Sequence, residues 1–297
     1  MRLLAPAKLN LGLRIVGRRA DGYHELESVF APLDLADRLE LSVEEGAPSS
    51  VELALAGDAE GGVPADAHNL AARAARAFLD AAGLRARVRI ALEKRVPAAA
   101  GLGGGSSDAG AVLRALDRRF PGALAAPELA RLALGLGADV PYFLDPRPAL
   151  VSGVGERRDP LPAPLPALSL VLANPGAPLA TAPVFAAYAA GGARPSARGA
   201  LAAALREAQA GPVEALAARL APLLANDLEA AAEALCPGIA GVREVLRAGG
   251  ALAVGLSGSG ATLYGVYAGP EAAQAALREA RLPEGAWARL ARTLEAG

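Results

Sequence analysis

The fold is decided by the stretch Pro97-Ala98-Ala99-Ala100-Gly101-Leu102-Gly103-Gly104-Gly105-Ser106-Ser107-Asp108-Ala109. It follows residues 85–93, where apolar and polar residues alternate as in a half-buried strand, and it precedes a predicted helix over residues 107–119. Glycines let the backbone bend and let a ligand approach closely, and a helix start offers unpaired N–H groups and partial positive charge. The stretch therefore predicts a phosphate-binding loop, with Ser106 and Ser107 as hydroxyl donors or as ligands of a bound metal.

Two well-known phosphate-binding motifs do not match this loop. A Walker A loop requires Gly-Lys-Ser/Thr, which is missing here. A dinucleotide-binding turn requires Gly-x-Gly-x-x-Gly with an acidic residue about 20 positions later, and that pattern is also missing. A flexible glycine loop that is simply capped by serine remains the alternative.

A second glycine segment joins two apolar runs near the end of the chain. Residues 251–256 and 261–267 predict two strands, and Ser257, Gly258, Ser259 and Gly260 connect them. The connection is either a hairpin turn or a second backbone nest for an anion.

The second half as a whole predicts a strand at 168–173, helices within 196–248, this strand pair, a helix from Pro270 and a strand near 287–294. That order suggests a ferredoxin-like α+β unit. The proline-rich residues 147–166 indicate a boundary or a covering loop.

The first half contains further strands and helices. Residues 8–15 alternate, which places Lys8 and Asn10 side by side on the polar face of a half-buried strand. Residues 38–43 and 51–55 also alternate and could pair with each other. Asn69 is a candidate cap for a helix that ends near residue 82, before Gly83, and a second helix follows Pro127.

Lysine is rare in this chain. Only Lys8 and Lys94 occur among 30 basic residues, and the others are arginine. A pressure that replaces lysine wherever arginine serves would spare lysines that must act as compact point charges. Both are therefore candidate functional residues, although two lysines could also survive by chance.

Composition excludes several classes of protein. The 297 residues are 53% hydrophobic and 21% charged with a net charge of −1, so we expect no nucleic-acid or membrane partner. We expect no signal peptide or spanning helix, and a lone cysteine, Cys236, fits a cytoplasmic protein without disulfides. One cysteine and two histidines cannot fill a zinc site, and no nucleophile elbow of a hydrolase occurs. We expect no metal held by the protein alone.

Three segments together resemble the three motifs of the GHMP kinase superfamily: Pro6-Ala7-Lys8-Leu9-Asn10, the glycine-serine loop above, and Gly255-Leu256-Ser257-Gly258-Ser259-Gly260-Ala261-Thr262. Three further segments resemble the branch that phosphorylates a cytidine-diphosphate-linked methylerythritol: Asp21-Gly22-Tyr23-His24-Glu25, Gly137-Ala138-Asp139-Val140-Pro141 and Asn226-Asp227-Leu228-Glu229.

The resemblance implies a two-domain α+β fold with the active site in the cleft between the domains. Residues 1–153 would form a ribosomal-protein-like GHMP kinase domain that carries the ATP-binding loop. Residues 154–297 would form the ferredoxin-like domain. The partners implied are small-molecule substrates, with ATP as co-substrate and Mg²⁺ carried with ATP. We expect a monomer or a weak homodimer.

The resemblance also implies catalytic roles. Asp139 would be the base for the substrate hydroxyl, and Lys8 beside it would steady the transferring phosphoryl group. A cation near Asp139 would keep that carboxylate ionised, and phosphoryl transfer depends chiefly on positioning and charge compensation. The alternatives are a turn or cap role for Asp139 and a solvated strand-edge position for Lys8.

Binding roles follow in the same way. Asn10 would orient the substrate, and Tyr23 would stack on cytosine while His24 bonds its edge. Phe185 would cover the other face of the base, with Thr181 nearby. The remaining implied residues surround ATP: Asn69, Lys94, Pro97, Ala98, Gly101, Leu102, Gly103, Gly104, Gly105, Ser106 and Ser107. Alone, Phe185 would be read as a core residue, Asn69 as a helix cap and Asp108 as a first-turn acid.

Two rival functions stay open at this point. The first is a superfamily kinase that acts on homoserine, mevalonate or a sugar, against which residues 21–25 argue. The second is a catalytically inactive nucleotide-binding protein, which the presence of both Lys8 and Asp139 opposes.

Overall fold

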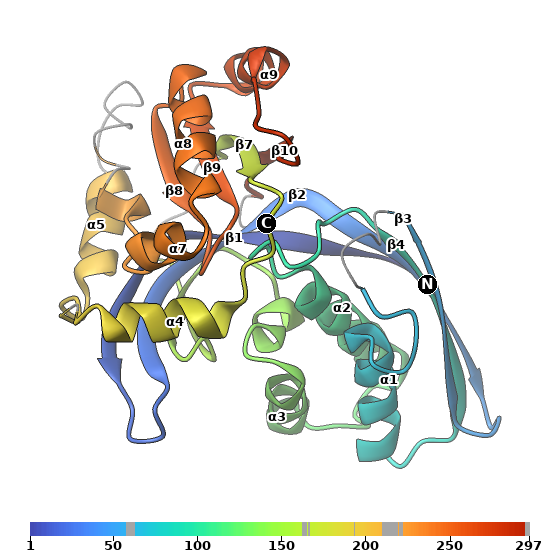
Figure 1. Cartoon of the computed structure of the whole chain (residues 1–297). Coiled ribbons are helices and arrows are strands. Elements are labelled where there is room, and N and C mark those ends of the chain that lie inside the picture. Colours follow the sequence, from blue (N-terminus) through green and yellow to red (C-terminus); the bar gives the residue numbers. More distant parts are fainter. Residues whose placement is uncertain are drawn as a thin grey trace. The chain divides into compact units, whose positions relative to one another are not determined.

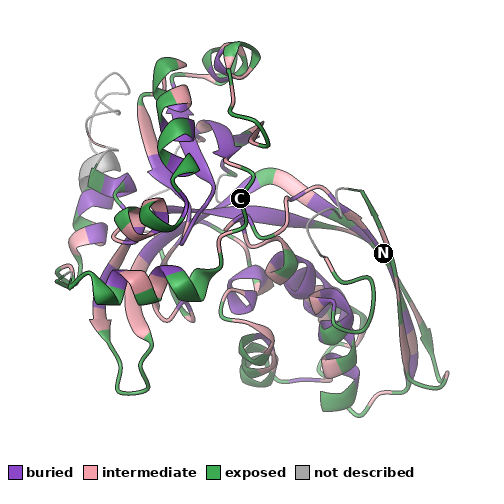
Figure 2. Ribbon diagram, viewed as in Figure 1, coloured by how far each residue is buried: buried purple, intermediate pink, exposed green. Residues whose placement is uncertain are grey.

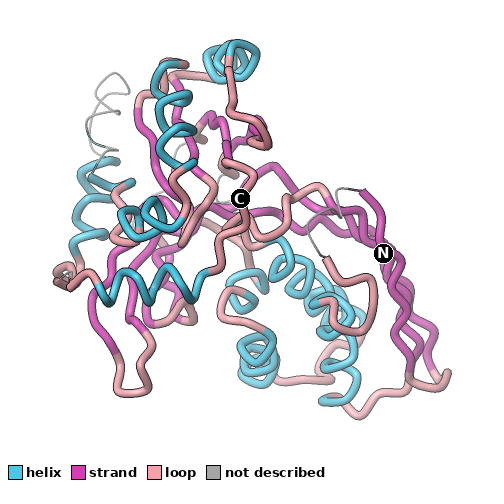
Figure 3. The backbone as a smooth tube through the Cα atoms, viewed as in Figure 1, coloured by secondary structure: helices cyan, strands magenta, loops and turns pink. Residues whose placement is uncertain are grey.

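The structure, a computed structural model, describes residues 1–57, 63–161, 165, 167–192, 194–209, 219 and 222–294. The chain forms two compact units (Figure 1). Unit 1 consists of Met1–Ala7, Leu35–Ala98 and Gly103–Pro146, and unit 2 consists of Lys8–Asp34, Ala99–Leu102 and Arg147–Gly297. The long strands β1 (Arg2–Arg18) and β2 (His24–Glu45) contribute to both units, and Figure 3 traces each as a continuous strand. The family-domain boundary between residues 153 and 154 stays a prediction.

In unit 1, β4 (Ala86–Lys94) is the middle strand of the sheet. It pairs in antiparallel fashion with the second half of β2 and in parallel with β3 (Ser50–Gly57). The prediction that residues 38–43 pair directly with 51–55 is therefore wrong. The apolar side of β4 is almost completely buried, which suits a central strand. The connection from β3 to β4 contains a helix, and it places β4 between β3 and β2.

Helices α1 (Leu70–Ala81), α2 (Gly104–Arg119), α3 (Ala126–Leu136) and the 3₁₀ helix η1 (Val140–Leu144) complete unit 1. Figure 2 shows α2 largely buried and α3 largely exposed. The predicted cap is confirmed, because Asn69 Oδ1 accepts a hydrogen bond from Ala71 N at 2.9 Å. The α2 helix starts at Gly104 instead of Ser107, so Asp108 lies in its second turn and the first-turn alternative is wrong.

Gly110 lets α2 approach η1 at backbone distance. A Cβ atom at this position would lie 2.4 Å from Phe143 Cβ and 2.8 Å from Phe143 O. Any larger residue would force the two elements apart. The glycine therefore sets the position of η1, and with it that of the residue before η1, Asp139.

In unit 2, β5 (Ala149–Gly153) pairs with the first half of β2, and β6 (Arg157–Pro160) pairs with β5. The predicted loop over residues 147–166 thus contains two strands. All four residues of β6 are exposed, so it lacks the alternation that identifies longer strands, and β5 has only five residues, which follow Pro146 and Pro148.

The four-stranded sheet of unit 2 has the order β10-β7-β9-β8, all antiparallel, as expected of a ferredoxin-like unit. Its strands are β7 (Ser169–Asn174), β8 (Ala253–Leu256), β9 (Leu263–Tyr267) and β10 (Trp287–Arg292). The helices are α4 (Thr181–Ala190), α5 (Ala200–Gln209), α7 (Glu229–Leu235), α8 (Gly238–Ala248) and α9 (Pro270–Glu279).

The helices predicted within residues 196–248 are confirmed as α5, α7 and α8, and residues 210–218 and 220–221 of that range lie outside the described residues. Cys236 is buried in the core of unit 2. Within the described part of the chain, no helix has the length and apolar character needed to cross a membrane.

Candidate active site

Lys8 and Asn10 form a buried pair on β1 in unit 2. The predicted strand is confirmed, but Lys8 is 4% exposed and Asn10 is 3% exposed, so both faces of the strand are covered and the prediction that it is half-buried is wrong. Lys8 Nζ donates a hydrogen bond to Asn10 Oδ1 at 2.6 Å, and it lies 4.7 Å from the centroid of the Phe30 ring. This burial excludes the alternative of a solvated lysine at a strand edge. A buried ammonium requires polar partners, and Asn10 Oδ1 is one.

The Asn10 amide has a defined orientation. Its Nδ2 donates to Ser28 Oγ at 2.8 Å, and Ser28 Oγ donates to Gly12 O at 2.7 Å. Asn10 Oδ1 is thereby turned toward the ammonium of Lys8. Ser28, which is completely buried, was missed in the sequence because a single serine in an apolar strand carries no signal. A direct role of Asn10 toward substrate stays a prediction.

The second glycine loop, residues 257–260, is a hairpin turn between β8 and β9. Ser257 N donates to Thr262 O at 2.9 Å, and Gly260 N donates to Ser257 O at 3.0 Å. A Cβ atom on Gly258 would lie 3.2 Å from Asn10 Oδ1 and 3.9 Å from Lys8 Nζ. The loop therefore lies directly against the Lys8–Asn10 pair.

The first part of the glycine-serine loop is bound to the same region of unit 2. Lys8 N donates to Leu102 O at 2.9 Å, and Ser257 Oγ donates to Gly101 O at 3.2 Å. A Cβ atom on Gly101 would lie 2.9 Å from Ser257 O and 3.0 Å from Gly260 O. Only glycine permits this approach, so the two predicted glycine loops meet within one unit.

The second part of that loop opens α2 in unit 1. Gly103 has the left-handed φ of 71° and precedes the helix, and the first helical hydrogen bond is Ser107 N to Gly103 O at 2.9 Å. The N–H groups of Gly104, Gly105 and Ser106 consequently have no partner within the helix. Ser107 Oγ is buried without a hydrogen-bond partner among the described residues. These donors suit phosphate oxygens.

Lys94 belongs to a buried cluster of charged side chains next to this loop. Its Nζ donates to Asp37 Oδ2 and, at 2.8 Å, to Asp108 Oδ2. Asp37 Oδ1 accepts from the backbone N–H groups of Arg95 and Val96 at 2.6 and 2.8 Å. Asp37 was missed in the sequence, and it holds the chain at the entry to the loop.

The predicted roles of Lys94 and Asn69 around adenine and ribose stay predictions. Lys94 is 3% exposed in the cluster. Besides capping α1, Asn69 donates from Nδ2 to Pro64 O at 2.8 Å. Pro97 and Ala98 join β4 to the loop within unit 1.

The surroundings of the cluster favour the protonated form of Asp108. Burial raises the pKa of Asp108 to about 8, with the charge of Lys94 opposing this rise and that of Asp37 adding to it. Burial lowers the pKa of Lys94, but the charges of Asp108 and Asp37 outweigh it and raise that pKa above its usual value. When Asp108 is protonated, the positive charge of Lys94 balances the single negative charge of Asp37. Charges in a buried site need to be paired in this way.

Replacing Asp108 with asparagine should flatten the pH dependence of stability. Folded protein keeps the Asp108 proton up to about pH 8, whereas unfolded chain loses it near pH 4, so wild-type stability should fall as pH rises through that range. The variant has no such proton. Urea unfolding between about pH 4 and 8 measures the slope. The exposed Asp80→Asn on α1 should keep the wild-type slope, and an unchanged slope in the Asp108 variant would contradict the assignment.

Aromatic side chains gather around His24 in unit 2. The rings of His24 and Phe185 stack with centroids 5.4 Å apart and planes at 27°, and Tyr188 meets His24 edge-on at 5.8 Å. Burial and the charge of Arg18 lower the pKa of His24, which favours a neutral imidazole. Phe185 is half-buried and packs against the core of unit 2, so the core alternative describes it in part. Tyr188, whose buried hydroxyl has no partner in the described chain, was missed.

The other two predicted substrate residues lie at exposed positions of unit 2. Tyr23 is 66% exposed at the turn between β1 and β2. Thr181 begins α4, and its Oγ1 lies 3.0 Å from Ser259 Oγ of the second glycine loop. Their contact with a substrate stays a prediction.

Asp139 precedes η1 in unit 1 and is half-buried. Its backbone oxygen accepts from Tyr142 N at 3.2 Å, but its side chain makes no capping bond to the helix. Asp139 thus lies in a turn, as the alternative states, but a capping bond does not account for its carboxylate. Lys8 belongs to unit 2 and Asp139 to unit 1, and their pairing stays a prediction.

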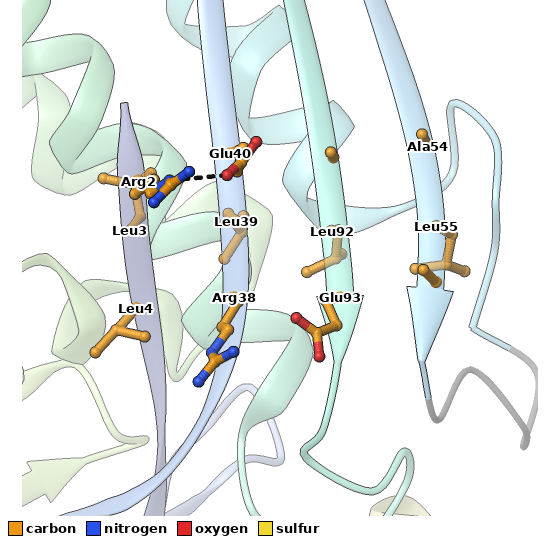
Figure 4. Close-up of a pocket in the computed structure, with 12 residues that line it drawn as sticks. Arg2, Leu3, Leu4, Arg38, Leu39, Glu40, Ala54, Leu55, Leu92 and Glu93 are labelled. Atoms are coloured by element: carbon orange, nitrogen blue, oxygen red, sulfur yellow. Dashed lines mark hydrogen bonds and ion pairs between the residues drawn. The ribbon is translucent and has the colours of Figure 1, made fainter.

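A pocket on the sheet of unit 1 holds none of the predicted site residues. Figure 4 shows it across strands β1, β2, β4 and β3, with an exposed ion pair between Arg2 and Glu40 at 2.9 Å. Its walls combine leucine and alanine side chains with these charges. It offers none of the phosphate-binding donors described above.

Known proteins share the motifs and the fold. Residues 69–145 match the GHMP kinases N terminal domain, and residues 201–283 match GHMP kinases C terminal. A 4-diphosphocytidyl-2-C-methyl-D-erythritol kinase of Thermus thermophilus is 44% identical over 97% of this chain and 95% of that protein. One from Polaromonas sp. is 48% identical over 62% of this chain, an alignment that spans only 60% of the Polaromonas protein.

A solved structure agrees with these relatives. The crystal structure of a 4-(cytidine 5'-diphospho)-2C-methyl-D-erythritol kinase is 42% identical, covers 99% of both chains and has a TM-score of 0.77. The two matched family domains together span more than half of the residues. This chain therefore belongs to the GHMP kinase family.

Proposed function

We propose that this protein transfers the γ-phosphoryl group of ATP to the 2-hydroxyl of 4-diphosphocytidyl-2-C-methyl-D-erythritol, giving the 2-phosphate and ADP in isopentenyl diphosphate biosynthesis by the non-mevalonate pathway. The observation that carries the proposal is the 44% identity, over 97% of the chain, to the Thermus kinase of that name. The buried Lys8–Asn10 pair beside a glycine loop supports it, because such a cation suits a phosphorylated ligand.

The reaction needs a base and charge compensation. Asp139 takes the proton of the 2-hydroxyl, the freed oxygen attacks the γ-phosphorus, and ADP leaves with the electrons of the broken P–O bond. Lys8 offsets the negative charge that spreads over the transferring group. The free N–H groups at the start of α2 hold the phosphates of ATP, and Asp37 and Lys94 keep that loop in place.

Mg²⁺ arrives with ATP in this proposal. Among the described residues, no three acidic, histidine or cysteine side chains gather as a metal site. Hydroxyl oxygens at the start of α2 fit an ion that is already bound to phosphates, and Ser107 Oγ is a buried polar atom without a partner there. Ser106 and Ser107 would hold the ion, which supplies positive charge at the phosphates.

The aromatic cluster of unit 2 would select the cytidine. A neutral His24 can exchange hydrogen bonds with the edge of cytosine, and burial next to Arg18 keeps it neutral. Tyr23, exposed at the hairpin turn, is available to stack on the base. Phe185 already supports the imidazole by stacking on it.

The substrate assignment is tested by assaying the purified protein with ATP and each of four acceptors. The acceptors are the cytidine substrate, homoserine, mevalonate and a sugar such as galactose. We expect kcat/KM to be highest for the cytidine substrate. Preference for another acceptor would overturn the proposal, and no transfer to any of them would favour an inactive nucleotide-binding protein.

Replacing Tyr23 with alanine should raise the KM for the cytidine substrate roughly 5- to 150-fold, because stacking on one base is worth about 1–3 kcal/mol. The KM for ATP should change little. Steady-state kinetics with each substrate varied in turn measure both constants. Leu290→Ala, which removes another exposed apolar side chain of unit 2, is the matched control. Equal changes in both KM values would dismiss the stacking role.

We also propose a monomer or weak homodimer located in the cytoplasm. The lone cysteine fits a reducing compartment. Light scattering at several protein concentrations would measure the mass, and a concentration-independent oligomer larger than a dimer would contradict this.

A further inference from the structure

The segment Asn226-Asp227-Leu228-Glu229 has no role in the reaction described above, yet it is bound to the strand that carries Lys8. Leu13 N donates to Ala225 O at 3.1 Å, and Asp227 N donates to Leu13 O at 2.9 Å. Asp227 Oδ2 accepts from Ile15 N at 2.8 Å. These bonds hold the segment against β1 over three residues, so Asn226 has a defined position beside this strand.

The side chain of Asn226 joins that position to the second glycine loop. Its Nδ2 donates to Leu256 O at 3.0 Å and to Gly258 O at 2.7 Å. Its Oδ1 accepts from Leu228 N at 2.9 Å. Asn226 is 7% exposed, so water does not compete freely for these bonds. One buried amide therefore holds two carbonyl groups of the loop.

The hydrogen bond from Asn226 to Gly258 O also fixes the direction of the next N–H group, that of Ser259. The C=O and N–H of a trans peptide point in opposite directions, so Ser259 N–H is turned away from Asn226. That N–H has no hydrogen-bond partner among the described residues, although Ser259 is only 7% exposed. A backbone N–H without a protein partner is a donor that an acceptor group of a ligand can satisfy.

The free donor belongs to the loop that lies on the Lys8–Asn10 pair. Gly258 is in direct contact with this pair, as the 3.2 Å from its ideal Cβ position to Asn10 Oδ1 demonstrates. Ser259 Oγ and Thr181 Oγ1 add two hydroxyl groups 3.0 Å apart. An ammonium, an amide N–H and two hydroxyls in one small region match the oxygens of a phosphate group.

We propose that Asn226 is a positioning residue for this loop. Its Nδ2 binds the carbonyls of Leu256 and Gly258 and so keeps Ser259 N–H available to a phosphate of the acceptor substrate beside Lys8. The proposal rests on the proposed function for the identity of that substrate. Asn226 itself touches no substrate and acts through the loop.

The sharpest test is Asn226→Asp, which keeps the size of the side chain and the acceptor for Leu228 N but removes both donors. At about pH 8, kcat/KM for the cytidine substrate should fall about 10- to 100-fold, the cost of a small misplacement of binding groups. The KM for ATP should stay within about twofold. As pH falls toward about 6, the introduced carboxyl gains a proton and one donor, so the activity relative to wild type should rise.

A second readout does not depend on activity. In wild type, Ser257 N–H and Gly260 N–H are bonded within the turn, and Asn226 stabilises that turn. Hydrogen exchange of these amides should be faster in Asn226→Asp. Ile239→Val, which trims the core of unit 2 on α8, is the control for general loss of stability and should leave both the exchange and the kinetics unchanged.

Asn226→Ser covers the case in which the aspartate variant does not fold. Serine can still accept from Leu228 N but cannot reach the loop carbonyls, so the same loss of kcat/KM and faster exchange are expected. Wild-type kinetics in both variants, or lower kcat/KM with unchanged loop exchange, would overturn the proposal. If wild type itself does not phosphorylate the cytidine substrate, the proposed function fails, while the exchange measurement still decides whether Asn226 holds the loop.

Discussion

Replacing Asp139 with asparagine is expected to lower turnover by about 10²- to 10⁴-fold, the usual contribution of a general base. The amide keeps the shape of the carboxylate but cannot take the proton of the acceptor hydroxyl. ATP binding should change little, because the donors that suit its phosphates lie at the start of α2. Single-turnover kinetics and calorimetric titration with an ATP analogue measure the two quantities separately.

The control for this variant is Asp145→Asn, an exposed carboxylate at the other end of η1. It should retain wild-type turnover. If Asp139→Asn also turns over normally, Asp139 is not the base. If it loses ATP binding together with turnover, the side chain has a structural role in unit 1 instead, which thermal unfolding would reveal as a lower Tm.

The second large effect is expected at Lys8. Lys8→Met retains most of the side-chain volume but removes the charge, and turnover should fall about 10²- to 10³-fold, as when one preorganised donor to a developing charge is lost. The buried Asn10 Oδ1 also loses its donor, so some loss of stability should accompany the change. Rapid-quench measurement of the chemical step and urea unfolding separate the two effects.

Lys8→Arg tests why lysine survives at this position. The slot around Nζ is bounded by Asn10, the Phe30 ring and Gly258, whose ideal Cβ position lies 3.9 Å away. A planar guanidinium is wider than an ammonium, so we expect turnover nearly as low as in Lys8→Met. The exposed Arg89→Lys should have no effect. Full activity of Lys8→Arg would show that a positive charge alone suffices.

Local signals predicted a large part of the fold. The strand before the glycine-serine loop, the helix after it and the cap at Asn69 follow from alternation and from side chains that act within a few residues. The ferredoxin-like order of the second half was also predictable, because each of its elements carries its own periodicity. The start of α2 was placed late, since glycine and serine give a poor helix signal although they begin this one.

Pairing between distant segments was not predictable in the same way. Two alternating segments, residues 38–43 and 51–55, suggested a direct pair, but β4 lies between them. Alternation of apolar and polar residues indicates a strand with one apolar face, but it does not indicate which strand pairs with it. The pairing depends on which strand buries most surface when the sheet is covered by α1 and α2.

Several functional residues were missed for a related reason. Asp37 lies 57 positions before Lys94, and only the folded unit 1 makes them partners. Ser28 supports Asn10 from the neighbouring strand. The segment of Asn226 was noted only as a family motif, and its bond to Gly258, 32 positions away, was missed. An aspartate, a serine or an asparagine alone in a sequence is indistinguishable from a surface residue.

The sequence by itself determined the family motifs and predicted which residues carry the chemistry: two glycine loops, two rare lysines and the aspartate of Asp139-Val140-Pro141. Only the tertiary structure decided that Lys8 is buried against Asn10 and Phe30, that Lys94 is held by two carboxylates, and that Asn226 holds the second loop. The physical reason is that motifs and periodicity act over a few residues. Burial and hydrogen bonds between distant residues exist only after strands have paired and cores have packed.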